Sequence, residues 1–274
     1  MDYDWKYFID DLKDGKIDIE PIAIHENAIK DVVGRLSKEK KREVRNLIKG
    51  MFCNYRTQKT ENCCIVEELM NAHTKYCKAN PEKEQLKRRH NAVVYRYMMK
   101  TAFHKKAIAI KLDVSFGTIQ NDISQTIEEI IILCFGMSIE RNEPKNLYEA
   151  VKGLFRHYQL LKLSQEIETE LIWKEWQQLR VESLEKTGRV IEYIEKAVQI
   201  YEAFIAGSSS PDMQKRALEV VKRIYLNGNS SISEMAAVYQ VTESIIYSDI
   251  NKMAERFAKL FEYMAINEPA RTGK

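Results

Sequence analysis

The chain has 274 residues with 43 basic and 40 acidic side chains, and the net charge of +3 excludes a histone-like protein that coats nucleic acid. Five cysteines, an odd number, fit a reduced cytoplasmic protein better than a disulfide scaffold, and no apolar run approaches the ~18 residues of a membrane span. With only 5 prolines and 10 glycines among many Glu, Lys, Leu, Ile and Ala residues, the composition predicts an all-α fold.

A basic segment, residues 26 to 59, comes first along the chain. Its helical stripe is formed by Leu36, Val44, Leu47, Ile48 and Met51, which predicts an amphipathic helix. Two interpretations of its basic face stay open: a solvated surface that covers a core, or a surface that contacts phosphate. We assign no function to residues 1 to 80.

Candidate metal ligands follow in residues 60 to 77. His73 and Cys77 would lie one turn apart on one helix face, and Cys63 could add a third zinc ligand. The segment has no CxxC pair, and the adjacent Cys63 and Cys64 would point in different directions on a helix. This pattern favours buried reduced thiols, so we expect no metal and no cofactor.

Residues 104 to 135 predict two helices joined by a tight turn. The first carries Ala107, Ile108 and Leu112, the turn passes through Asp113 and Val114, and Ser115 has the residue type that caps the second helix. The second helix has an apolar stripe formed by Ile119, Ile123, Ile127 and Ile130. Its opposite face would enter a DNA major groove in a DNA-binding protein, and it carries Phe116, Gly117, Gln120, Asn121 and Ser124.

The middle of the chain, from 145 to 206, has a nearly continuous helical pattern. It does not sustain a heptad, so we expect two packed helices broken near Thr187 and Gly188, with self-association through this segment as an open alternative. The run Gly207–Pro211 predicts a linker. The sequence therefore predicts three parts: residues 1–143 with a first helix-turn-helix at about 81–137, a connector at 144–206, and a second unit at 207–274.

An internal repeat supports the second unit. Shifting the chain by 127 residues without a gap matches the first motif to residues 232–261. The matched pairs are Ala109 with Ala236, Val114 with Val241, Ser115 with Thr242, Ile119 with Ile246, Asp122 with Asp249, Ile123 with Ile250 and, in the preceding helix, Arg89 with Arg216. The turn, the cap and the core positions are matched together, which predicts a second helix-turn-helix.

Both copies resemble the helix-turn-helix of sigma-factor region 4 and of phage late-gene transcriptional regulators of Gram-positive bacteria. The resemblance rests on an Ala in the first helix, a Val in the turn, a Ser or Thr cap and an Asp-Ile pair in the second helix, and it covers about 45 residues in each half. It implies duplex DNA binding, with residues 115–124 and 242–251 facing the bases. The relatives usually carry Arg or Lys on this face, which this chain lacks.

The candidate DNA contacts follow from these two motifs. Candidate base contacts are Ser115, Phe116, Thr118, Gln120, Asn121, Ser124, Ser244, Tyr247, Ser248 and Asn251. Candidate phosphate contacts are Arg88, Arg89, Lys105, Lys106, Lys111, Lys215 and Arg216. Glu243 heads the second recognition helix and would repel phosphate, so the second copy is expected to bind DNA weakly or to contact protein.

No motif of nucleotide, metalloprotease or nucleophile chemistry is present, and the histidines are dispersed, so we expect no enzyme. Three hypotheses remain: a DNA-binding transcriptional regulator of a phage or mobile element, a sigma-like accessory factor that docks on RNA polymerase, and a protein-binding inhibitor that reuses the helical scaffold. The helix-turn-helix pattern favours the first.

Overall fold

A computed structural model describes residues 3–13, 29, 37–55, 62–80, 83–137, 144–208 and 211–266, and every regular element within them is helical. The all-α prediction is therefore confirmed. No helix in this part of the chain is both long enough and apolar enough to span a membrane. The elements are α1 (Tyr3–Lys13), α3 (Lys38–Asn54), α4 (Asn62–Ala79), α5 (Glu84–Val93), the π-helical η1 (Val94–Met98), α6 (Lys105–Lys111), α7 (Phe116–Phe135), α8 (Leu147–Ser164), α9 (Lys174–Gly207), α10 (Pro211–Val221), the π-helical η2 (Lys222–Leu226), α11 (Ile232–Val238) and α12 (Glu243–Ile266).

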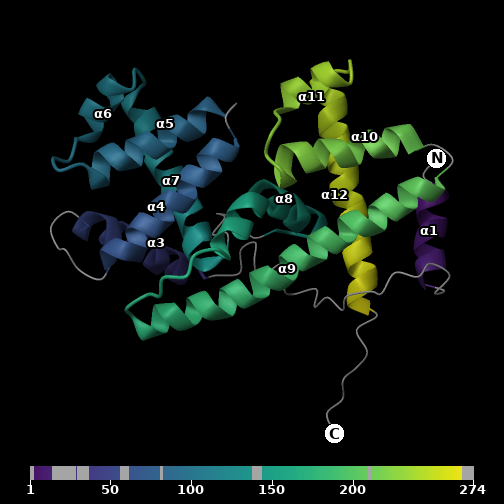
Figure 1. The fold of residues 1–274 in the computed structure, drawn as a ribbon, viewed down its shortest axis with the longest axis horizontal. Coiled ribbons are helices and arrows are strands. Elements are labelled where there is room, and N and C mark those ends of the chain that lie inside the picture. The colour runs from purple at the N-terminus through teal and green to yellow at the C-terminus, as the bar shows by residue number, and fades with distance from the viewer. Residues whose placement is uncertain are drawn as a thin grey trace, which may run out of the picture.

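Helix α8 lies at the centre of the molecule. Figure 1 shows α3 to α7 gathered on one side of it and α10 to α12 on the other, and α8 packs against both α7 and α12. The long helix α9 runs along both groups. Buried apolar side chains form one continuous cluster from α1 to α12. Whether the three predicted parts fold separately stays a prediction.

The expected break near Thr187 and Gly188 is wrong, because α9 is a single helix of 34 residues. The middle segment divides instead between α8 and α9, at residues 165–173. Thr187 is buried, and its hydroxyl lies between the carbonyls of Ser183 and of Gly136, just beyond α7, so its single hydrogen is shared between these two acceptors. The small side chains here let the end of α7 approach α9, so Thr187 and Gly188 mark a packing contact.

The repeat has the same order of elements in both halves. The first unit is α5, η1, α6 and α7, and the second is α10, η2, α11 and α12, with a π-helical segment at the same place in each. Helices α6 and α7 correspond to α11 and α12 at the predicted shift of 127 residues. The π segments begin at Val94 and Lys222, a shift of 128, so the gapless alignment is wrong by one residue in the helix that precedes the motif.

Candidate nucleic-acid interface

The turn of the first unit is held by backbone geometry. Asp113 has the left-handed conformation, with φ 50°, between α6 and α7. The N–H of Val114 donates to the Ala109 carbonyl at 3.0 Å, which closes the turn against the preceding helix. Aspartate is one of the few non-glycine residues that tolerate this conformation, so the sequence and the turn agree.

The turn of the second unit repeats this geometry. Gln240 has φ 52°, and the N–H of Val241 donates to the Ala236 carbonyl at 3.0 Å. The helix before the turn, α11, begins with a capping box in which Ser231 and Glu234 satisfy each other's backbone N–H groups. Both units therefore fix the angle between their two helices through the same local contacts.

Ser115 caps α7 as expected. Its hydroxyl oxygen accepts from the Thr118 N–H at 3.0 Å, and the two hydroxyl groups lie 2.8 Å apart. These contacts already engage Ser115 and Thr118 at the start of the recognition helix. Among the predicted base contacts of the first unit, these two side chains have the least freedom to turn toward a ligand.

The exposed face of α7 carries the rest of the first predicted set. Phe116 is 42% exposed, and Gln120, Asn121 and Ser124 are also exposed. The last three side chains make no hydrogen bond to any residue that the structure describes. This face therefore presents amide and hydroxyl groups that are available to a ligand, beside one aromatic ring.

Two arginines predicted to contact phosphate are instead paired with the recognition helices. The guanidinium of Arg88 donates to Asp122 Oδ2 and Oδ1 at 2.8 and 3.2 Å, and that of Arg216 donates to Asp249 Oδ2 and Oδ1 at 2.7 and 3.3 Å. In each pair the carboxylate raises the pKa of the arginine. The aspartates are nearly fully buried, so we call the two pairs the Arg–Asp clamps. The residue that corresponds to Arg216 is thus Arg88, and not Arg89.

Arg89 also has an internal role. Its Nη1 donates to Gln125 Oε1 at 2.8 Å and to Glu129 Oε1 at 3.1 Å, both on α7. We therefore revise the assignment of Arg88, Arg89 and Arg216 from phosphate contacts to contacts that hold α5 against α7 and α10 against α12.

The predicted lysine contacts keep their ammonium groups at the surface. Lys105, Lys106 and Lys215 have no ion pair within the described ranges, and Lys106 and Lys215 are exposed. Lys111 Nζ lies 5.0 Å from the ring centroid of Tyr95, which orients it while leaving it exposed. In the first unit, the helix before the turn, α6, thus carries three lysines, and the helix after it, α7, carries the open face.

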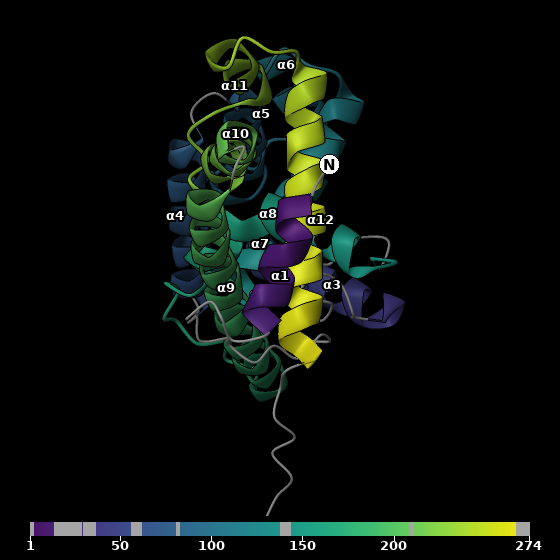
Figure 2. The same ribbon diagram turned by 90° about the vertical axis from the view of Figure 1, so that its right-hand side faces the viewer.

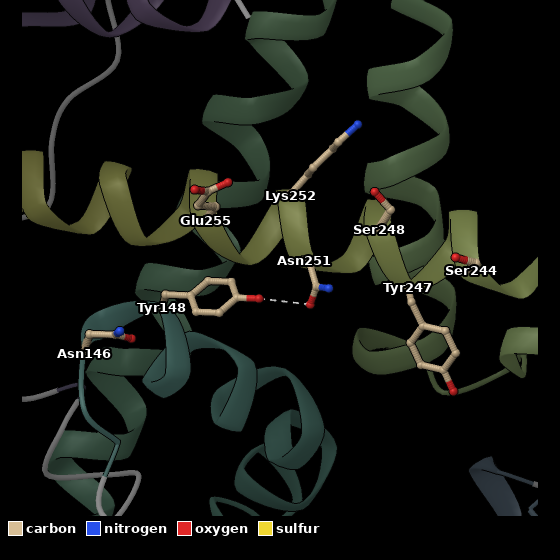
Figure 3. Close-up of a pocket in the computed structure, with 8 residues that line it drawn as sticks. All are labelled: Asn146, Tyr148, Ser244, Tyr247, Ser248, Asn251, Lys252 and Glu255. Carbon is tan, nitrogen blue, oxygen red and sulfur yellow. Dashed lines mark hydrogen bonds between the residues drawn. The ribbon is translucent and has the colours of Figure 1, made fainter.

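The equivalent face of α12 lines a groove of about 690 Å³ that it shares with the start of α8. Figure 3 shows Asn251 and Tyr148 pointing toward one another across it. Asn251 Oδ1 accepts from the Tyr148 hydroxyl at 3.0 Å and from Lys152 Nζ at 2.9 Å. All four predicted base contacts of the second unit line this groove, which are Ser244, Tyr247, Ser248 and Asn251.

The short first helices of the two motifs, α6 and α11, lie at one end of the molecule. Both Figure 1 and Figure 2 place α6 and α11 at the same end, beyond the central helix α8. Because α8 packs against α7 and against α12, the two recognition helices have a fixed relative position.

The structure brings only some of the candidate metal ligands together. His73 and Cys77 do lie side by side on α4, but the Cys63 thiol donates to the Tyr55 carbonyl and lies outside the cluster. The third potential ligand is His90 on α5, which the spacing of residues on one helix could not identify. Burial raises the pKa of the Cys77 thiol to about 12, and burial together with His73 lowers the pKa of His90 to about 4. Both groups are therefore neutral at pH 7.

Comparisons with protein-family models, with curated proteins and with solved structures gave no match to this chain.

Proposed function

We propose that the chain binds duplex DNA through its two helix-turn-helix units and regulates transcription, with the first unit as the main reader of sequence. The observation that carries the proposal is the open face of α7, where Gln120, Asn121 and Ser124 are exposed and make no hydrogen bond to a described residue. Amide side chains in a major groove can bond the edge of adenine with two hydrogen bonds.

The lysines of α6 are proposed to contact the DNA phosphates. Lys105, Lys106 and Lys111 lie on the short helix before the turn, where a helix-turn-helix protein crosses the phosphate backbone. Lysine-phosphate contacts release counterions and provide affinity for every sequence. The amides of α7 and the lysines of α6 thus separate into groups for specificity and for affinity.

The second unit is proposed to contribute less. Asn251, its best candidate for a base contact, is held by Tyr148 and Lys152, so reading a base would first require these hydrogen bonds to break. Glu243 is exposed at the start of α12 and would lie near phosphate.

The test is binding of the full chain to a fluorescent random duplex at several salt concentrations. Lys105→Glu/Lys106→Glu should weaken binding to all sequences and reduce the slope of log K against log salt by about one unit per lysine. The matched control is Lys174→Glu/Lys259→Glu, which reverses two exposed charges far from either turn. Equal loss in both variants, or no binding by the parent chain at low salt, would exclude the proposal.

The second arm measures sequence preference by selection from a random duplex library. Gln120→Ala/Asn121→Ala should leave the salt slope unchanged and reduce discrimination at the contacted positions by about 1–3 kcal/mol for each lost pair of hydrogen bonds. An unchanged preference would mean that α7 does not read the bases. Ser244→Ala/Ser248→Ala is expected to have the smaller effect, because it changes the second unit.

A further inference from the structure

A cluster of nitrogen and sulfur atoms lies beneath the first recognition helix, independent of the surface proposed to bind DNA. His73 and Cys77 come from α4 and His90 from α5, and their three potential ligand atoms all lie within 4.8 Å of one another. His73 Nδ1 is 2.9 Å from His90 Nδ1 and 3.7 Å from Cys77 Sγ. Two helices are thus joined at one point by groups that bind metals.

The two distances measured from His73 Nδ1 are close to those within a tetrahedral zinc site. Bond lengths of about 2.05 Å to nitrogen and 2.3 Å to sulfur place two nitrogens about 3.3 Å apart and a nitrogen and a sulfur about 3.6 Å apart. The His73–Cys77 separation already fits. The two Nδ1 atoms would need to move apart by about 0.4 Å, and the two imidazole rings, whose planes lie 7° apart, would need to turn toward the shared ion.

The surroundings of His73 fix the tautomer that a metal requires. Its Nε2 lies 2.9 Å from Glu129 Oε2 and donates to it, which leaves a lone pair on Nδ1 facing the cluster. Glu129 is held in turn by Arg89 at 3.1 Å. A carboxylate behind a histidine in this way is the usual outer shell of a zinc ligand.

The surroundings of His90 also suit a bound metal. The Thr74 hydroxyl donates its hydrogen to the Met70 carbonyl at 2.8 Å, so it can only accept from His90 Nε2, which is 3.5 Å away. If His90 Nδ1 carries the proton and donates to His73, Nε2 and the Thr74 oxygen are two acceptors that face each other. With a metal bound to His90 Nδ1, the imidazole proton resides on Nε2 and faces the Thr74 oxygen, which can accept it. Metal binding would therefore remove the unfavourable approach of two acceptors.

We propose that His73, Cys77 and His90 form a three-ligand Zn²⁺ site, with solvent supplying the fourth ligand. Cys77 and His90 are half-buried, so water can reach the site, whereas His73 is fully buried. Binding releases the thiol proton of Cys77 to the solvent as the sulfur–metal bond forms. The ion would tie α4 to α5 and, through Glu129, to α7.

The experiment is a titration of chelator-treated full chain with ZnCl₂, followed by calorimetry and by metal analysis after gel filtration. One equivalent of zinc should bind, and the melting temperature should rise with free zinc. Less than half an equivalent in the correctly folded chain would overturn the proposal. This result does not depend on DNA binding, so the two proposals fail separately.

Variants locate the site. Cys77→Ser and His90→Gln should each abolish stoichiometric binding, and Glu129→Gln should weaken it about 10- to 100-fold. Cys63→Ser is the matched control and should bind like the parent chain, because its thiol lies outside the cluster. Retained binding in Cys77→Ser would overturn the assignment.

Cobalt(II) gives an optical measurement on the same variants. The parent chain should show a thiolate-to-cobalt absorption band that Cys63→Ser retains and Cys77→Ser loses. A spectrum without that band in the parent chain would exclude Cys77 as a ligand, whatever the folding of the variants.

Discussion

At the scale of single residues, each Arg–Asp clamp combines a buried carboxylate with a two-pronged hydrogen-bond geometry. Asp122 and Asp249 are 2% and 1% exposed, and each carboxylate receives two hydrogen bonds from one guanidinium. A buried ion pair contributes little net stability because desolvation opposes the attraction, but its two-pronged geometry fixes orientation. The clamps therefore set the position of each recognition helix against the helix that precedes its motif.

Replacing the arginine of a clamp should lower the free energy of unfolding by a different amount from replacing the aspartate. The side chain of Arg88 is 29% exposed and can be hydrated, whereas Asp122 cannot. Arg88→Met leaves a buried carboxylate unpaired and should lower the free energy of unfolding by about 3 kcal/mol, while Asp122→Asn should lower it by about half as much. Urea unfolding of both variants and of the double variant measures the difference. Equal losses would show that the carboxylate is not desolvated.

At the scale of elements, α7 ends against α9. Gly136 follows α7 with φ 64°, and its N–H donates to the Ile132 carbonyl at 2.7 Å. Buried Arg180 of α9 donates to the Cys134 carbonyl at 2.9 Å, and Thr187 donates to the carbonyl of Gly136. Two carbonyl groups at this helix end, those of Cys134 and Gly136, are thus satisfied by α9.

Alanine at position 136 should be destabilising for two reasons. The left-handed conformation is strained for alanine, and its Cβ would lie 2.9 Å from Leu184 Cδ2 and from Thr187 Oγ1. We expect Gly136→Ala to lower the free energy of unfolding by about 1–3 kcal/mol.

Gly50→Ala is the control for this substitution. Gly50 lies within α3 with no atom near the added Cβ, so alanine should raise the free energy of unfolding by about 0.5–1 kcal/mol. Thermal unfolding of both variants gives the sign of each change. If Gly136→Ala left the free energy of unfolding unchanged, α9 would have to move away from the added methyl group at this contact.

Local sequence signals predicted the motif but not its distant contacts. Ser115, Asp113 and the Ile119 stripe gave the turn and the buried face of α7, because caps, turns and periodicity act within a few residues. The partner of Asp122 was missed by one position, because residues 99–104 join η1 to α6 whereas the shorter 227–231 joins η2 to α11. A gapless comparison cannot register that difference.

Contacts between helices far apart in sequence carry no local signal. His90 meets His73 from the next helix, and Asn251 meets Tyr148 across 103 positions. Thr187 and Gly188 have a composition typical of a helix break, but burial against the end of α7 keeps α9 continuous. Tertiary packing outweighs the weak helix propensity of two residues.

At the scale of the whole molecule, α8 contacts both units. Phe155 is buried between Tyr225 and Phe257, with ring centroids 6.1 and 5.4 Å away. One turn further along α8, Gln159 Oε1 accepts from Asn80 Nδ2 at 2.6 Å and so joins the second half of the chain to the end of α4. Within the described residues, the buried cluster contains side chains from both sides of each predicted domain boundary.

This continuity predicts that the two units unfold together. Phe155→Ala removes a ring from the interface of α8 with η2 and α12, and should lower the free energy of unfolding by about 3–5 kcal/mol. The two ring contacts of Phe155 described above are both with the second unit, but we expect hydrogen exchange to accelerate in α7 as well as in α12, because α8 packs against both. Val181→Ala, at a 53% exposed position on α9, should change neither. Exchange that accelerates in α12 alone would show that the first unit folds independently, and would favour the three-part division over a single cooperative body.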